Sequence, residues 1–309
     1  MEPFKITLSN EATLTGLVNA GSGPAILPNR LPLIVCLHGG TYTSRYFHVD
    51  ASHTASSVSN SLGVPLVAIN RPGYADSTSF YPIPQGSSYP QEYGIWLHRY
   101  ILPAIWAEFG EPRGCNCIVL HCHSLGSTGA IIAASMHAAS EPIEATYPLA
   151  GLVISGFGSQ PSGEAYKPQG DETTITFPPK VKDSIMLQQG CADSSIYQYT
   201  EELNHGMPVE EIGDVHTAWF PRWKEWAGNV KAPVMAAVAQ DDVMWKGTRE
   251  HINDFGSAFT GSERVDTSVV IGAPHNMEMS YWATGWYTRS FGFALECAAS
   301  FAHKNQSST

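Results

Sequence analysis

The sequence Cys122-His123-Ser124-Leu125-Gly126 constrains this chain more than any other, because it joins an apolar run to an alanine-rich run. The apolar residues 118–121 predict a buried strand and residues 125–139 predict a helix. A serine at a sharp strand-to-helix turn needs small residues two positions before and after it, since the backbone is crowded there. Gly126 meets this need and Cys122 is only somewhat larger, so we predict that Ser124 is a nucleophile. The alternative is that Ser124 merely caps the helix.

This turn lies within a regular alternation of short strand-like runs and longer helical runs. The alternation is typical of an α/β protein with a mostly parallel twisted sheet and helices on both faces. The expected strands are residues 4–8, 13–18, 33–37, 65–69, 118–121, 152–155, 234–238 and 267–271. The expected helices are residues 44–62, 92–109, 125–139, 245–255 and 277–301.

The alternation breaks at residues 156–231, whose first third is rich in glycine, proline, serine and threonine. Helical runs return within this segment, so we interpret it as an inserted helical cap rather than a separate domain. The short helical runs are residues 182–189, 194–204 and 219–226. The predicted organisation is a core of residues 1–155 and 232–304, a cap of residues 156–231 and a flexible tail of residues 305–309.

An acid and a histidine follow two later strands. Residues 234–238 run into Asp241 and Asp242, and residues 267–271 run into a loop that contains His275. Open parallel sheets place their active sites at the carboxyl ends of their strands. The order serine, acid, histidine is the one expected when a nucleophilic serine occupies such a strand-to-helix turn. We therefore predict a triad of Ser124, His275 and one of the two aspartates.

With these motifs, the chain resembles the α/β-hydrolase superfamily over nearly its whole length. Within that superfamily it is similar to the capped serine hydrolases. The resemblance rests on five stretches. Four of their residues differ from those usual in the family, namely Asn70, Ala75, Cys122 and Ala239. They are His38-Gly39-Gly40, Asn70-Arg71-Pro72-Gly73-Tyr74-Ala75-Asp76-Ser77, Cys122-His123-Ser124-Leu125-Gly126, residues 233–242 and Gly272-Ala273-Pro274-His275-Asn276. The last loop is similar to that of enzymes of fungal secondary metabolism. The register of residues 233–242 implies that Asp242, and not Asp241, is the triad acid.

The expected roles follow from the chemistry of a serine nucleophile. His275 removes the proton of the Ser124 hydroxyl, and Asp242 orients the imidazole and stabilises the imidazolium. A developing oxyanion needs preorganised donors. The resemblance implies that the backbone N–H groups of Gly40 and Leu125 form this oxyanion hole.

Aromatic residues gather late in the predicted cap and beside the predicted acid and histidine. Trp219, Trp223 and Trp226 share one helical face, which favours packing of the cap onto the core. The alternative is that part of this stripe covers an apolar substrate pocket. For that pocket we name Trp219, Trp223, Trp245 and Tyr281 as candidates. The absence of an Arg or Lys cluster for a phosphate favours a small, neutral and largely apolar acyl substrate.

Composition excludes several other classes of function. The net charge of −11 disfavours nucleic acid as a partner, because an acidic surface repels phosphates. No apolar run is long enough to span a bilayer and no signal peptide is apparent, so we expect an intracellular, cytoplasmic protein. Cys115-x-Cys117 and His121-x-His123 are interpreted as strand packing, so neither a metal nor a cofactor is expected. The oligomeric state stays open.

Three functions fit these features. The first is hydrolysis of an ester or thioester through an acyl-enzyme. The second is carbon–carbon bond cleavage, acyl transfer or ring closure in natural-product metabolism with the same triad. The third is a binding protein that keeps the fold without catalysis. Substrate identity cannot be predicted from fold.

Overall fold

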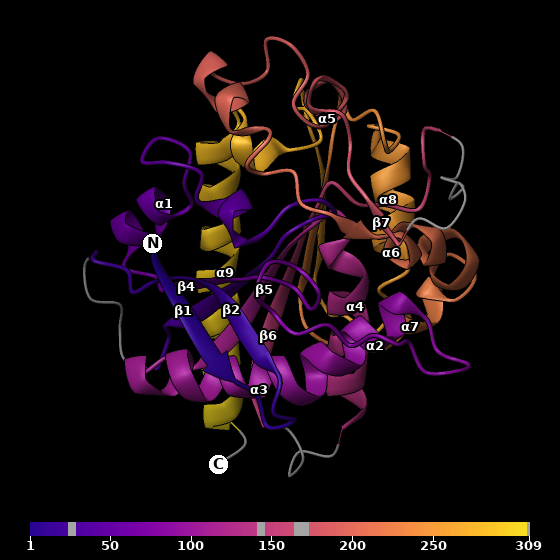
Figure 1. The fold of residues 1–309 in the computed structure, drawn as a ribbon. Helices are drawn as coiled ribbons and strands as arrows, with labels where there is room; N and C mark the ends of the chain where they lie inside the picture. Colours follow the sequence, from indigo (N-terminus) through magenta and orange to yellow (C-terminus); the bar gives the residue numbers. More distant parts are fainter. Residues whose placement is uncertain (24–28, 141–145, 164–172, 308–309) are drawn as a thin grey trace.

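The structure is a computed structural model that describes residues 1–23, 29–140, 146–163 and 173–307. Its centre is one twisted sheet with the strand order β1-β2-β4-β3-β5-β6-β9-β10 (Figure 1). β2 runs antiparallel to both of its neighbours, and every other neighbouring pair is parallel. The strands are β1 (Glu2–Thr7), β2 (Thr13–Asn19), β3 (Pro32–Leu37), β4 (Leu66–Ile69), β5 (Cys117–His123), β6 (Leu149–Ser155), β9 (Val234–Ala239) and β10 (Val265–Val270).

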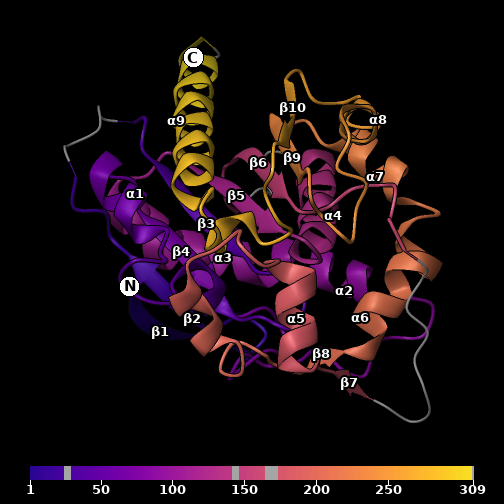
Figure 2. The same ribbon diagram turned by 90° about the horizontal axis from the view of Figure 1, so that it is seen from above.

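Helices cover both faces of this sheet, as Figure 2 shows from above. On β3, Leu33, Val35 and Leu37 belong to one apolar cluster, whereas Ile34 and Cys36 belong to the cluster on the opposite face. This alternation arises because successive strand residues point to opposite faces. One face packs against α1 (Ser56–Leu62) and α9 (Ala283–Ser307), and the other against α2 (Tyr89–Trp96), α3 (Leu102–Ile105), α4 (Gly126–Ala139) and α8 (Arg249–Ser257). The predicted α/β class, a mostly parallel sheet with helices on both faces, is confirmed.

Three of the predicted helices begin later than the sequence pattern suggested, and one of them, expected at 277–301, begins at Ala283. The helix expected at residues 44–62 is a short turn at Ser44–Phe47 followed by α1. Between them the Asp50 carboxylate accepts hydrogen bonds from the N–H groups of Ser52 and His53, which favours a turn over a helix. The helix expected at 245–255 is α8, which begins at Arg249 because the Thr248 side chain caps its first turn.

The helical run at residues 89–110 continues through Pro103. Proline lacks the N–H that an α-helix needs, and its ring crowds the preceding turn. The turns at Leu97–Ile101 and Trp106–Gly110, on either side of α3, widen to an i→i+5 pattern. This widening lets the helix accommodate the proline without ending.

The inserted segment 156–231 forms short elements at the end of the sheet where the parallel strands finish. In Figure 1 its first helix, α5, lies above the upper end of the sheet. The elements are β7 (Thr174–Ile175), α5 (Pro179–Met186), a turn at Ser194–Tyr199, β8 (Met207–Pro208), α6 (Val209–Asp214), a wide turn at Val215–Trp219 and α7 (Trp223–Asn229). The sequence pattern predicted α5 and the later helical turns approximately and did not indicate α6. The division into core and cap stays a prediction.

The chain closes with α9, which continues to Ser307. The predicted tail at 305–309 is therefore helical as far as this residue, and residues 308–309 lie outside the described part of the chain. The packed face of α9 ends at Phe301 and Ala302, and the helix continues through the exposed residues 303–306, because extending a formed helix needs no new nucleation. Among the described residues, no helix is both long enough and apolar enough to cross a membrane.

Candidate active site

Ser124, His275 and Asp242 form one chain of side-chain contacts. The Ser124 Oγ lies 3.2 Å from His275 Nε2, and His275 Nδ1 lies 2.8 Å from Asp242 Oδ2. All three residues are buried, and each follows a strand of the sheet: β5, β10 and β9 respectively. The structure thus brings together three predicted residues that are far apart in the sequence.

The turn that carries Ser124 is strained. Ser124 has a φ of +50°, in the left-handed region that non-glycine residues rarely adopt. A Cβ on Gly126 would lie 2.6 Å from the carbonyl oxygen of His38 and 2.7 Å from that of Leu37, so only glycine fits there. Cys122 is fully buried at the position where glycine is usual. Its thiol fits into the core and leaves the turn intact.

The two neighbouring aspartates differ in their surroundings. Asp242 is buried, and its Oδ1 accepts hydrogen bonds from the N–H groups of Met244 at 2.8 Å and Trp245 at 3.2 Å. These bonds leave Oδ2 oriented toward His275. Asp241 is exposed. The structure therefore places Asp242, the residue named from the sequence register, in contact with the histidine.

Gly40 and Leu125 border the same cavity as Ser124. A Cβ on Gly40 would meet the Met207 sulfur and would lie 2.9 Å from Leu125 Cδ1, which shows how closely this turn packs on the start of α4. A Cβ on Gly39 would lie 3.0 Å from the Ser124 Cβ. The two N–H groups predicted as oxyanion donors thus belong to residues beside the serine, and their role stays a prediction.

A cavity of about 330 Å³ opens at Ser124. This volume is at the lower end of the range typical of small-molecule sites. Besides the predicted site residues, its walls are mainly apolar side chains of the inserted segment and of the loop after Asp242. They include Phe177, Ile185, Met186, Met207, Ile212, Val215, Val243, Met244 and Trp245, together with the imidazole of His216.

Of the four aromatic pocket candidates, only Trp245 lines this cavity, so the other three assignments are corrected. Trp219 stacks on Trp226, and Trp223 stacks on Phe255 of α8. Both indoles are buried. Trp223 packs the inserted segment onto α8 of the core, whereas the ring contacts of Trp219 are with Trp226 and Phe157 of the same segment.

The third corrected candidate is Tyr281, which is 64% exposed. The sequence pattern assumed one continuous helix at residues 219–226. The structure instead has a wide turn at Val215–Trp219 and a separate helix α7, and neither Trp219 nor Trp223 lines the cavity.

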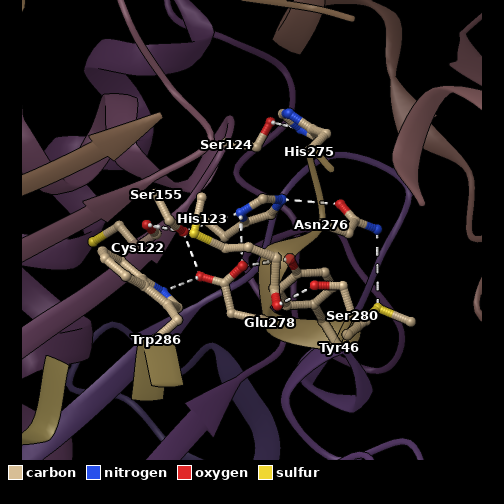
Figure 3. A network of polar contacts seen from close by, with 12 residues as sticks. Tyr46, Cys122, His123, Ser124, Ser155, His275, Asn276, Glu278, Ser280 and Trp286 are labelled. Carbon is tan, nitrogen blue, oxygen red and sulfur yellow. Dashed lines mark hydrogen bonds and ion pairs between the residues drawn. The ribbon is translucent and has the colours of Figure 1, made fainter. Parts of the chain in front are cut away.

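A fully buried carboxylate, that of Glu278, lies behind the serine turn (Figure 3). It accepts hydrogen bonds of 2.8 Å from the Tyr46 hydroxyl and from the Trp286 indole. It also accepts one from the Ser155 hydroxyl and lies 3.2 Å from His121 Nε2. An ionised group is costly to bury unless it is well hydrogen-bonded. These donors satisfy that requirement.

His123 connects this carboxylate with the triad. Its Nδ1 lies 3.4 Å from Glu278 Oε2, and its Nε2 lies 3.1 Å from Asn276 Oδ1 (Figure 3). The His123 and His275 rings have centroids 4.9 Å apart. Because His123 precedes Ser124 and Asn276 follows His275, this contact joins the two loops that carry the nucleophile and the base.

The buried groups have shifted pKa values. Burial by itself would raise the pKa of Glu278, but His123 nearby and the hydrogen bonds from His121 and Ser155 lower it to about 2. Burial lowers the pKa of His123 to about 4, against the attraction of Glu278. A carboxylate charge therefore lies behind the triad at neutral pH, beside an uncharged imidazole.

Sequence reasoning missed this cluster because it treated His121 and His123 as packing residues. Two histidines two positions apart on an otherwise apolar strand point to the same face of the sheet and require buried partners. That signal indicates that a polar partner exists but not which residue it is. No group of three or more His, Cys, Asp or Glu side chains within the described ranges could hold a metal ion.

Comparisons with known proteins agree with this architecture. The sequence profile of a family described as "Alpha/beta hydrolase family" matches residues 34–285. No curated protein sequence matches the chain.

Solved structures that resemble this chain cover nearly all of it. A monoacylglycerol lipase from Paleococcus ferrophilus is 16% identical, with a TM-score of 0.62 over 96% of this chain and 100% of its own. An N-acyl homoserine lactonase in complex with N-hexanoyl homoserine is 13% identical, with a TM-score of 0.61 over 96% and 97%. A thioesterase domain from the curacin biosynthetic pathway is 12% identical, with a TM-score of 0.58 over 94% and 99%. At these identities the likeness establishes the fold.

Proposed function

The chain belongs to the α/β-hydrolase family, and on that premise we propose that it is a serine hydrolase that cleaves an ester or thioester of a small, largely apolar acyl substrate. The observation that carries this proposal is the contact chain from Ser124 through His275 to Asp242. A hydroxyl, an imidazole and a carboxylate in series are what general-base activation of a serine requires.

In the proposed mechanism, His275 Nε2 takes the Ser124 proton as the oxygen attacks the substrate carbonyl carbon. Asp242 keeps the N–H of Nδ1 oriented and stabilises the imidazolium that forms. The tetrahedral oxyanion is bound by the N–H groups of Gly40 and Leu125. The imidazolium then protonates the leaving alcohol or thiol, and an acyl-enzyme remains on Ser124. Water activated by His275 hydrolyses it.

The walls of the cavity support the substrate class. Among the described residues that line the cavity, most carry aliphatic, aromatic or thioether side chains, and none is a Lys, Arg, Asp or Glu. Three methionines, Met186, Met207 and Met244, give the cavity flexible and polarizable walls, which suit acyl chains of varied shape. We propose that the segment 156–231 acts as a cap, since it supplies Phe177, Ile212 and other lining residues.

The experiment that tests this function is covalent labelling with a fluorophosphonate, followed by turnover of p-nitrophenyl esters. We expect labelling and ester hydrolysis by the wild type, and loss of both in Ser124→Ala. The matched control is Ser127→Ala, which removes a buried hydroxyl of α4 that lies outside the triad. A folded wild type that resists the probe would contradict the proposal and favour a binding protein. Labelling without ester turnover would instead favour carbon–carbon cleavage or acyl transfer.

A further inference from the structure

The turn at residues 38–41, which carries Gly40, is held from both sides by buried basic side chains. The Arg71 guanidinium donates from Nη2 to the carbonyl oxygen of Gly39 at 3.0 Å. The Lys182 amine donates to the carbonyl oxygen of Thr41 at 3.0 Å. Both basic residues are almost completely buried. Their two acceptors are the carbonyls on either side of Gly40.

The Gly39 carbonyl belongs to the same peptide unit as the Gly40 N–H. Besides the bond from Arg71, it lies 2.8 Å from His38 Nδ1. His38 Nε2 accepts from the Arg71 backbone N–H at 3.1 Å, so Nδ1 must carry the proton and donate to Gly39. Two donors on a carbonyl polarise its peptide unit and strengthen the N–H at the other end. The Gly40 N–H is therefore a stronger donor than an ordinary amide.

Thr41 shows why the other side of the turn needs support. Its φ is +61°, which is unusual for a β-branched residue and unfavourable for the backbone. Such conformations persist only where surrounding contacts hold them. The Thr41 carbonyl accepts from Lys182 and from the His205 N–H at 2.9 Å. Lys182 also donates to the Leu203 carbonyl at 2.7 Å and lies over the Tyr42 ring at 3.7 Å.

Both supports depend on the inserted segment. Lys182 lies on α5 itself, and Arg71 is held in place by Glu211 of α6, with 2.5 Å between Nη1 and Oε1. The Glu211 carboxylate also accepts from the Tyr74 hydroxyl at 2.5 Å. Burial lowers the pKa of Lys182 to about 7, but the amine keeps N–H donors in either protonation state.

We propose that Arg71 and Lys182 are positioning residues that orient and polarise the Gly40 N–H for the oxyanion, so that segment 156–231 contributes to catalysis as well as to substrate enclosure. This inference rests on the proposed function. Burying two basic groups costs more than an apolar packing of similar shape would cost. Both groups donate to the carbonyls of the residues beside Gly40, and a role in orienting the Gly40 N–H explains why they are buried there.

The test compares Lys182→Met and Glu211→Gln with two controls on the same helices, Lys180→Met and Glu210→Gln. Lys180 is exposed, and Glu210 accepts a hydrogen bond from the Tyr81 hydroxyl at the surface. All four are made in the full chain, and circular dichroism establishes that each is folded. We expect kcat for a p-nitrophenyl ester to fall about ten- to hundred-fold in the first pair, with KM within about threefold of wild type. The control pair should keep wild-type kcat.

A transition-state analogue separates a catalytic effect from a structural one. The inhibition constant of an alkyl trifluoromethyl ketone, which forms a tetrahedral adduct, should weaken by the same factor as kcat/KM. The affinity for an alkyl alcohol that only fills the cavity should not change. If the wild type hydrolyses the ester and folded Lys182→Met and Glu211→Gln retain its kcat, the inference is wrong and the proposed function survives. If the wild type neither labels nor turns over, the proposed function itself fails.

Discussion

The side chain of Asn276 contacts that of His123, with 3.1 Å between Asn276 Oδ1 and His123 Nε2. Each residue is the chain neighbour of a proposed triad member, so this contact sets the distance between the serine turn and the histidine loop. The Asn276 amide also donates to the Tyr42 hydroxyl at 2.7 Å, which leaves it little freedom to rotate. The precision of a Ser–His contact depends on such supporting bonds, because small displacements of reacting groups lower rates strongly.

Replacing Asn276 should therefore weaken catalysis more than binding. In Asn276→Leu the shape is nearly kept, but His123 and Tyr42 lose a buried partner. We expect kcat for a p-nitrophenyl ester to fall about tenfold with little change in KM, and the free energy of unfolding to fall by about 1–3 kcal/mol. Asn253→Leu, on the exposed side of α8, is the matched control. Unchanged kcat in the Asn276 variant would show that the contact has no part in positioning.

The two neighbouring aspartates should differ in their effect on turnover. Asp242→Asn keeps the volume but removes the charge that stabilises the imidazolium and selects its tautomer, so kcat should fall by roughly 10⁴. Asp241→Asn alters an exposed side chain and should stay within about twofold of wild type. Steady-state kinetics on both variants decides the matter. A large loss only in the Asp241 variant would reverse the assignment.

Glu278 should make the stability of the protein depend on pH in acid. Its pKa is lowered from an ordinary value of 4.5 to about 2 in the folded chain. A lowered folded-state pKa favours folding fully above the ordinary value, and this contribution disappears as the pH falls toward 2. The shift corresponds to about 3 kcal/mol, as an order of magnitude.

Urea unfolding at pH 7, 4.5 and 3 measures this effect. In Glu278→Gln the free energy of unfolding should be about 3–5 kcal/mol lower at pH 7, with a smaller difference at pH 3. Glu250→Gln, in the exposed first turn of α8, should follow the wild-type curve. Parallel pH curves for wild type and Glu278→Gln would contradict the predicted linkage.

The cavity predicts which esters are accepted. Ile212 lines its wall from α6, and a larger ring there would occupy part of the 330 Å³. We expect Ile212→Trp to lower kcat/KM for p-nitrophenyl octanoate at least tenfold relative to p-nitrophenyl acetate. Val181→Trp, at an exposed position of α5, should leave this ratio unchanged. Equal losses for both esters would show that this wall does not bind the acyl chain.

The sequence alone was sufficient to predict the strands of the main sheet, their order along the chain and the candidate triad. These features are local: strand and helix periodicity mark the elements, Gly126 marks the tight turn after Ser124, and Asp242 and His275 follow strands whose carboxyl ends share one edge. Once the sheet is parallel, its topology brings these strand ends together. The register of residues 233–242 even distinguished Asp242 from Asp241, and only Asp242 contacts His275 in the structure.

Only the tertiary structure decided what supports these residues. Glu278, Arg71, Lys182 and Glu211 are polar residues in segments whose local pattern is that of ordinary surface or turn residues, yet all four are buried. Their partners lie far away along the chain, and no periodicity encodes which distant atom a buried polar group will meet. The same reason applies to the tryptophans, because their spacing did not indicate that Trp219 would stack on Trp226 and Trp223 on Phe255. Local patterns determine elements and their ends, whereas burial and hydrogen bonding between distant segments follow from how those elements pack.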